Sequence, residues 1–147
     1  MELKVKTISE KETEYIEIGC HKYDENIKEI VKIIKLHHGS VDGYREEEQY
    51  QIPISDIYYI EAVDERIFIY LKKECYESRR RLYEFEDSLG DRGFVRISKS
   101  LIVNMMKIVS IKPALNGRFV CKLKNGEDVI ISRKYVSGLK EKLQEKR

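Results

Sequence analysis

The sequence predicts a mainly β fold of antiparallel strands with short helices (α+β), preceded by a small β–α module. From Ile52 onward, short apolar runs rich in β-branched and aromatic residues recur between polar turns. Asn-Gly pairs at 116–117 and 125–126 separate such runs and are typical of tight hairpins. Apolar residues at three-to-four-residue spacing, which indicate amphipathic helices, occur only in a few short stretches.

The chain divides into two predicted units, residues 1–45 and residues 46–147. The polar segment 42–51 marks the boundary between them. In the first unit we expect short strands at 2–8 and 13–19, on either side of a polar turn.

A helix completes the first unit. It runs from about Asp24, a suitable N-cap residue, to His38, and Gly39-Ser40 ends it. One apolar stripe follows the helix and comprises Ile27, Ile30, Val31 and Ile34. This stripe is either a dimer or regulatory surface, or a face that packs on the strands before it.

The second unit contains most of the predicted strands. They lie at 57–60, 67–71, around Tyr76, and at 94–98, 108–111, 118–123 and 129–131. Two helices are marked by Leu82, Phe85 and Leu89, with Gly90 past the end, and by Tyr135, Leu139 and Leu143, with Ser132 as cap. About eight short strands with turns at this spacing indicate a sandwich or an open barrel.

The charges divide unevenly along the chain. Residues 92–147 contain 14 Lys/Arg and 4 Asp/Glu, a formal charge of +10, whereas residues 1–91 contain 14 Lys/Arg and 22 Asp/Glu, a charge of −8. The net charge of +2 conceals this division. A strongly basic end indicates a polyanionic partner.

The segment 94–104 stands out within the basic third. Val95 and Ile97 share one face of the predicted strand and should point to the core. If the strand continued, Lys99 would point the same way, and burial of an unpaired lysine is costly. The strand should therefore end near Ser98.

A turn carrying two hydroxyls and an ammonium follows that strand. Lys99 and Ser100 suit contacts with phosphate, and Arg96, on the outward face of the strand, suits a contact with a base edge. The alternative is a solvated turn with ordinary surface charges.

Two further basic clusters occur. Arg133 and Lys134 would lie in the first turn of the last helix, where cations oppose the helix dipole unless an anion, either a phosphate or a neighbouring carboxylate, lies nearby. Arg79-Arg80-Arg81 precedes an acidic helix segment, and local ion pairing with Glu84, Glu86 and Asp87 is the favoured explanation.

Several classes of function are disfavoured. The sequence lacks a phosphate-binding Gly-rich loop, a Gly-x-Ser-x-Gly motif and a His-Glu-x-x-His motif, so we expect no enzyme, no cofactor and no small-molecule substrate. The histidines and three cysteines have no metal-ligand spacing, so no metal site is expected. Without a long apolar stretch or a signal core, the protein is expected to be cytoplasmic and not membrane-embedded.

From about Ile52 to the C-terminus, the chain resembles the LytTR DNA-binding domain of bacterial transcription regulators. The matching blocks are Asp56-Ile-Tyr-Tyr-Ile-Glu61, Leu82-Tyr-Glu-Phe-Glu86, Phe94-Val-Arg96-Ile-Ser98-Lys99-Ser100-Leu-Ile-Val-Asn104, Asn125-Gly126 and Ile131-Ser132-Arg133-Lys134-Tyr135. The resemblance implies an elongated stack of small antiparallel sheets that reads successive major grooves with loops.

The resemblance also implies which residues contact DNA. These are Arg96, Lys99 and Arg133, with a further contact from the turn Asp64-Glu65-Arg66. Lys134, beside Arg133, remains a candidate from the basic cluster described above. Ser100 and Asn104 match positions that shape the loop as much as they touch DNA. Family members often carry histidine at the place of Ser98 and arginine or asparagine at the place of Lys99, so the preferred DNA sequence does not transfer.

Together these observations predict a sequence-specific, DNA-binding transcription regulator of a bacterium. We expect it to bind repeated half-sites of double-stranded DNA as a homodimer, and a regulatory protein partner is conceivable. About 45 residues precede the DNA-binding part, too few for a receiver domain, which predicts a free-standing regulator. The alternatives are a protein-interaction module that binds an acidic partner and an RNA-binding β domain.

Overall fold

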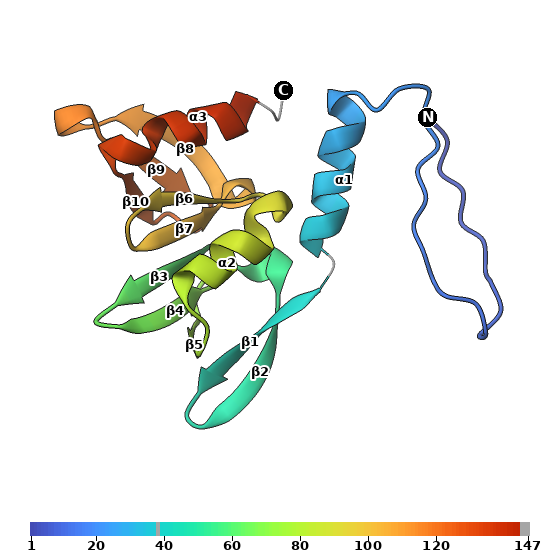
Figure 1. Cartoon of the computed structure of the whole chain (residues 1–147), viewed down its shortest axis with the longest axis horizontal. Helices are drawn as coiled ribbons and strands as arrows, with labels where there is room; N and C mark the ends of the chain where they lie inside the picture. The colour runs from blue at the N-terminus through green and yellow to red at the C-terminus, as the bar shows by residue number, and fades with distance from the viewer. Residues whose placement is uncertain (38, 145–147) are drawn as a thin grey trace.

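The structure, a computed structural model of the 147-residue chain, describes residues 1–37 and 39–144. It consists of a β body and an N-terminal arm, residues 1–24, that runs away from that body (Figure 1). His38 and residues 145–147 lie outside the described residues, so the predicted helix end at His38 is untested.

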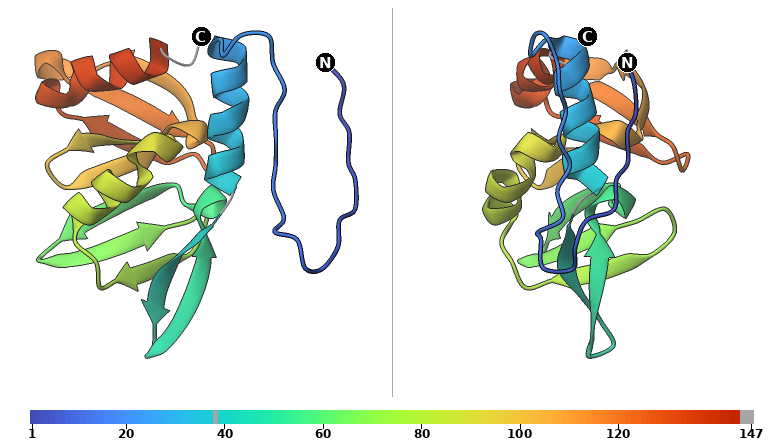
Figure 2. Two further views of the ribbon diagram at one scale, coloured as in Figure 1. Left: turned by 45° about the vertical axis from the view of Figure 1, so that its right-hand side comes forward. Right: turned by 90° about the vertical axis from the view of Figure 1, so that its right-hand side faces the viewer.

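The N-terminal arm contains no helix or strand, so the prediction of strands at 2–8 and 13–19 is wrong. The polar turn between them is present, because the Glu12 amide donates to the Ser9 carbonyl over 3.0 Å. Leu3 and Ile16 are 92% and 70% exposed. Apolar runs form strands only when a neighbouring strand pairs with them and a core covers one face. Within the described chain the arm has neither (Figure 2).

Helix α1 (Glu25–His37) begins where the sequence predicts. The Asp24 side chain caps it by accepting a hydrogen bond of 3.0 Å from the Ile27 amide. Ile27 is buried, and the helix contacts the 3-10 turns Ile54–Asp56 and Gly90–Arg92. The apolar stripe therefore packs on turns of the β body, and the predicted packing on preceding strands is wrong.

The larger sheet is antiparallel and has seven strands in the order β2-β1-β5-β4-β3-β7-β6. They are β1 (Ser40–Arg45), β2 (Glu48–Pro53), β3 (Tyr59–Val63), β4 (Arg66–Tyr70), β5 (Cys75–Ser78), β6 (Phe94–Ser98) and β7 (Leu101–Asn104). The predicted boundary after residue 45 falls in the turn between β1 and β2, and both strands belong to this one sheet.

The smaller sheet has three strands, β8 (Ile108–Pro113), β9 (Phe119–Leu123) and β10 (Asp128–Ile131), in the order β10-β9-β8. Both predicted Asn-Gly turns are confirmed. Asn116 and Gly117 have φ of 62° and 74°, and Gly126 has φ of 91°, which are left-handed values that these residues tolerate. Helix α3 (Val136–Gln144) follows β10.

Two apolar cores give the body its layers. Helix α2 (Leu82–Leu89) covers one face of the larger sheet, where Phe85, Phe94 and Ile60 are almost fully buried. On the other face, Ile97 and Val103 pack with the smaller sheet and α3. The result is a stack of small antiparallel sheets with short helices, which confirms the predicted fold class (Figure 1).

Candidate nucleic-acid interface

Four segments converge at one end of the strands, on the left of Figure 1. We call them the basic edge: residues 64–66, 98–100, 114–118 and 132–134. Backbone bonds link neighbouring members, because the Ala62 amide donates to the Ser100 carbonyl and the Ser132 amide to the Ile97 carbonyl, both over 2.8 Å. These segments carry 5 Lys/Arg and 2 Asp/Glu, so they concentrate positive charge.

The Arg96 side chain stabilises the turn between β6 and β7. Its Nε donates to the Ser98 carbonyl over 2.9 Å, and a terminal nitrogen donates to the Lys99 carbonyl. Another terminal nitrogen lies 3.6 Å from the Glu86 carboxylate on α2, and the Arg96 side chain is only 20% exposed. The outward direction predicted for Arg96 is confirmed, yet its guanidinium is largely occupied by the turn it supports.

Lys99 is the exposed residue of that turn. Its backbone carbonyl is fixed by Arg96, while its ammonium has no ion-pair partner in the described part of the chain. Ser100 beside it is half-buried; its amide donates to the Ser98 hydroxyl over 3.2 Å. β6 ends at Ser98, as predicted from the cost of turning Lys99 inward.

Asn104, predicted to shape the loop as much as to touch DNA, is fully buried, so its side chain has no exposed surface to offer a partner. Its Nδ2 donates to the Ile57 carbonyl over 2.9 Å, and its Oδ1 accepts from the Met106 amide over 3.0 Å. A buried amide with both ends bonded joins β7 to the segment before β3 and caps the next 3-10 turn. Its role is structural.

Arg133 and Lys134 are exposed at the start of the last helical segment. Ser132 does not cap it with its side chain, so that prediction is wrong; the Ser132 carbonyl instead accepts from the Tyr135 amide over 2.8 Å in a 3-10 turn. The stem of Arg133 crosses Gly117, where an added Cβ would lie 2.8 Å from Arg133 Cδ. The bare glycine therefore lets Arg133 pass over the turn between β8 and β9.

Arg66 lies at the far end of this row, directly after a turn in which Asp64 and Glu65 have φ of 50° and 66°. Its guanidinium pairs with Glu77 through contacts of 2.5 Å and 3.2 Å and lies over the Phe68 ring. The hydrogen bond from Arg66 lowers the pKa of Glu77. Arg66 is thus at the basic edge but already has an acidic partner.

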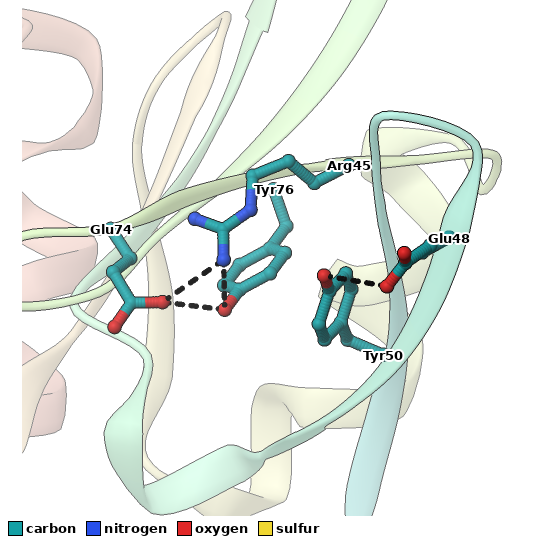
Figure 3. Close-up of polar contacts among 5 residues, drawn as sticks. All are labelled: Arg45, Glu48, Tyr50, Glu74 and Tyr76. Carbon is teal, nitrogen blue, oxygen red and sulfur yellow. Dashed lines mark hydrogen bonds and ion pairs between the residues drawn. The ribbon is translucent and has the colours of Figure 1, made fainter.

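A second polar cluster lies away from the basic edge and holds the β1–β2 hairpin to β5 (Figure 3). The Arg45 guanidinium lies 4.4 Å from the centre of the Tyr76 ring and donates to the Tyr76 hydroxyl over 3.2 Å. The Tyr76 hydroxyl donates to Glu74 over 2.5 Å, and this bond, with burial, raises the pKa of Tyr76. Because Arg45, Glu74 and Tyr76 all hydrogen-bond to one another, we assign the cluster to structure.

Three other kinds of functional feature are missing from residues 1–37 and 39–144. The described chain holds no group of three or more His, Cys, Asp or Glu side chains placed to bind a metal ion. Within the same residues, no helix is both long and apolar enough to span a membrane. No two α-helices there follow one another in the chain, so a helix-turn-helix unit is missing from this part.

Comparison with known proteins places the chain among bacterial regulators. The family model described as "LytTr DNA-binding domain" matches residues 47–144. An uncharacterized HTH-type transcriptional regulator of Staphylococcus aureus strain NCTC 8325 is 31% identical over 141 residues, which cover 92% of this chain and 94% of the relative. Regulators with the same description from strains N315 and MRSA252 are 30% identical over the same shares.

A solved structure agrees with these matches. It is the LytTr DNA-binding domain of a Bacillus cereus protein described as a methyl-accepting/DNA response regulator. The two folds superpose with a TM-score of 0.68 and 28% sequence identity, covering 72% of this chain and 97% of the Bacillus domain.

Proposed function

The chain belongs to the LytTR DNA-binding domain family, and we propose that it is a transcription regulator that binds double-stranded DNA with its basic edge. Its turns would enter the major groove, where each base pair presents a distinct set of donors and acceptors. The arrangement of the described helices supports this mode, because a consecutive pair that could act as a helix-turn-helix is missing from residues 1–37 and 39–144.

The observation that carries the proposal is the state of Lys99. Its ammonium is exposed and unpaired among the described residues, on a turn that Arg96 and the Ala62–Ser100 bond hold in one shape. Because the backbone of this turn is already held, contact between the Lys99 ammonium and a phosphate or a guanine requires little further ordering of the main chain. An ordinary solvated turn does not need such support.

The other residues of the basic edge would contribute to DNA binding in different ways. Arg133 and Lys134, exposed beside this turn, would contact bases or phosphates, and Ser100 would add a hydroxyl contact. Arg96 positions the turn more than it reads a base. Arg66 would have to exchange Glu77 for DNA, so we expect its contribution to be smaller.

We further propose that two copies bind repeated half-sites. A single basic edge spans one short row of turns, and closed pairs of identical chains are the usual way to lengthen such a footprint. The apolar side chains of Leu3 and Ile16 are exposed on the N-terminal arm, which supports a contact outside the chain itself. Light scattering of the free protein and of its DNA complex measures the number of copies.

Selection of bound fragments from a pool of random duplexes tests the main proposal. Lys99→Ala and Arg133→Ala should each weaken binding to the selected duplex by about 1–3 kcal/mol if they contact base edges. As a matched control, Lys73→Ala removes an exposed lysine of the β4–β5 turn, at the opposite end of the strands, and should leave affinity unchanged.

Three results would contradict the proposal. If the pool yields no preferred duplex at any salt concentration, the protein does not recognise DNA sequence. If a structured or single-stranded RNA outcompetes every duplex, the RNA-binding alternative is correct. Equal losses for Lys99→Ala and Lys73→Ala would move the site away from the basic edge.

A further inference from the structure

Three consecutive arginines, Arg79, Arg80 and Arg81, follow β5 and lead into α2. All three are exposed. The sequence favoured neutralisation by the acidic residues of the following helix. The structure shows a different distribution of ion pairs.

Only one of the three arginines has a carboxylate partner among the described residues. Arg80 Nε lies 3.4 Å from Glu84, and the Arg80 guanidinium also lies over the Phe85 ring. Glu86, which could have served the same cluster, pairs with Arg96 instead. Neither Arg79 nor Arg81 therefore has an ion pair of its own among the described residues, although the charge of Arg79 acts on Glu77, the carboxylate that Arg66 already pairs.

Arg79 is held in place by an aromatic contact, and the carboxylate that its charge acts on, Glu77, is hydrogen-bonded to Arg66. Its guanidinium lies 3.9 Å from the centre of the Tyr44 ring of β1. An arginine stacked on an aromatic ring keeps its planar fork of N–H donors open at the rim, the geometry that matches a phosphate. Arg81 precedes the first residue of α2 in an extended conformation, with no side-chain capping bond.

The arginines continue the basic edge beyond Arg66. Ile67 pairs with Ser78 across β4 and β5, so Arg79 follows the strand end that lies beside Arg66. Arg66 in turn follows the β3–β4 turn, which neighbours the β6–β7 turn through the Ala62–Ser100 bond. Figures 1 and 2 both place the start of α2 on the same side as these turns.

We propose that Arg79 and Arg81 form a phosphate-binding extension of the basic edge. They contact the DNA backbone beside the segment that Lys99 and Arg133 read, so they lengthen the footprint without reading sequence. The extension rests on the proposed DNA-binding function. It predicts that affinity gained here depends on salt and on duplex length and is independent of base identity.

The test uses the full chain and the duplex obtained by selection. The double variant Arg79→Gln/Arg81→Gln keeps a polar, unbranched side chain at each position, shorter than arginine, and removes both charges. Each phosphate contact contributes about −0.9 to the slope of log affinity against log salt, so the slope should become shallower by about two. The ranking of single-base variants of the duplex should not change.

Two matched variants separate position from charge. Arg80→Gln removes the neighbouring arginine that Glu84 already pairs, and it should change the slope much less. Lys72→Gln/Lys73→Gln removes two exposed charges at the opposite end of the strands and should leave the slope unchanged. If the slope of log affinity against log salt becomes shallower by the same amount in all three variants, the effect depends only on net charge, and the proposed extension is wrong.

Duplex length provides a second measurement on the unaltered protein. Trimming the flank of the selected duplex should make its slope shallower, and the trimmed and full duplexes should give the same slope with the double variant. If the double variant keeps the wild-type slope while selective binding persists, the extension is wrong and the DNA-binding function stands. If the wild-type protein selects no duplex, the proposed function itself fails.

Discussion

Lys99 and Asn104 lie five residues apart in one segment, but one is exposed and the other is buried. Lys99 is exposed at the tip of a turn, and Asn104 is fully buried with both ends of its amide bonded. Both are polar, and both lie in one stretch whose residue types suggest contact with DNA. The distinction is set by strand pairing, because Asn104 lies opposite Phe94 inside the sheet.

Arg96 is intermediate in exposure between Lys99 and Asn104, and its role can be tested by substitution. Arg96→Ala removes two hydrogen bonds from a charged guanidinium and should lower the free energy of unfolding by about 1–3 kcal/mol. It should also weaken binding to all base variants of the duplex alike, because Lys99 loses its support. Urea unfolding and fluorescence anisotropy measure the two effects. Unchanged stability with altered preference at one base would show that Arg96 reads that base directly.

The three cysteines differ in a way that pH and alkylation reveal. Burial raises the pKa of Cys121 from 9.0 to about 11, whereas Cys20 is exposed. At pH 8 iodoacetamide should label Cys20 quickly and Cys121 only after unfolding, as peptide mass spectrometry would show. Because the folded pKa is the higher one, this thiol contributes stability below pH 9 that is lost as pH rises toward 11. Equal labelling of both cysteines would contradict the packing of the smaller sheet.

At the level of elements, Gly117 and Gly126 form a matched pair. Both have positive φ, 74° and 91°, so alanine at either should cost about 1–2 kcal/mol of folding free energy. Only at Gly117 would the new Cβ meet the stem of Arg133; at Gly126 nothing lies within 4 Å. We therefore expect both variants to unfold at lower urea and only Gly117→Ala to bind DNA more weakly. Equal DNA affinity in the two variants would show that Arg133 does not contact DNA.

Local patterns predicted the elements whose signals are themselves local. Alternation in 94–98 located β6 and its end at Ser98, and Asn-Gly located two hairpins. The spacing of Leu82, Phe85 and Leu89 located α2. These features depend on sterics within a few residues and on which face is buried.

Elements that depend on distant partners could not be predicted. The hairpin β1–β2 is mostly polar, so its sequence predicts a domain boundary. In the structure, contacts among Arg45, Tyr76 and Glu74 hold this hairpin to β5 (Figure 3). The arm at 1–24 has strand-like apolar runs but no neighbouring strand within the described chain. In the candidate site, the exposure of Lys99 followed from strand parity, whereas the carbonyl contacts of Arg96 and the burial of Asn104 arise from tertiary contacts.

In the whole molecule, the positive charges that are unevenly distributed along the sequence also gather in one region of the surface, the basic edge. The four segments of the basic edge come from residues 64 to 134, so the fold adds Arg66, with Arg79–Arg81 beside it, from the acidic part of the chain to the basic C-terminal part. The remaining acidic surface should keep other faces away from DNA and orient the approach, since complementary fields act mainly on association and specificity.

Amide hydrogen exchange of the full chain, with and without the selected duplex, tests the location of the DNA contact most directly. Protection on binding should concentrate at 98–100, 114–118 and 132–134, with a weaker effect at 64–66. The turns at 71–74 and 124–127, which meet at the opposite end of the strands through the Asn125–Lys72 hydrogen bond, should exchange unchanged. Protection confined to those opposite turns or to α1, with the basic edge unaffected, would contradict the account.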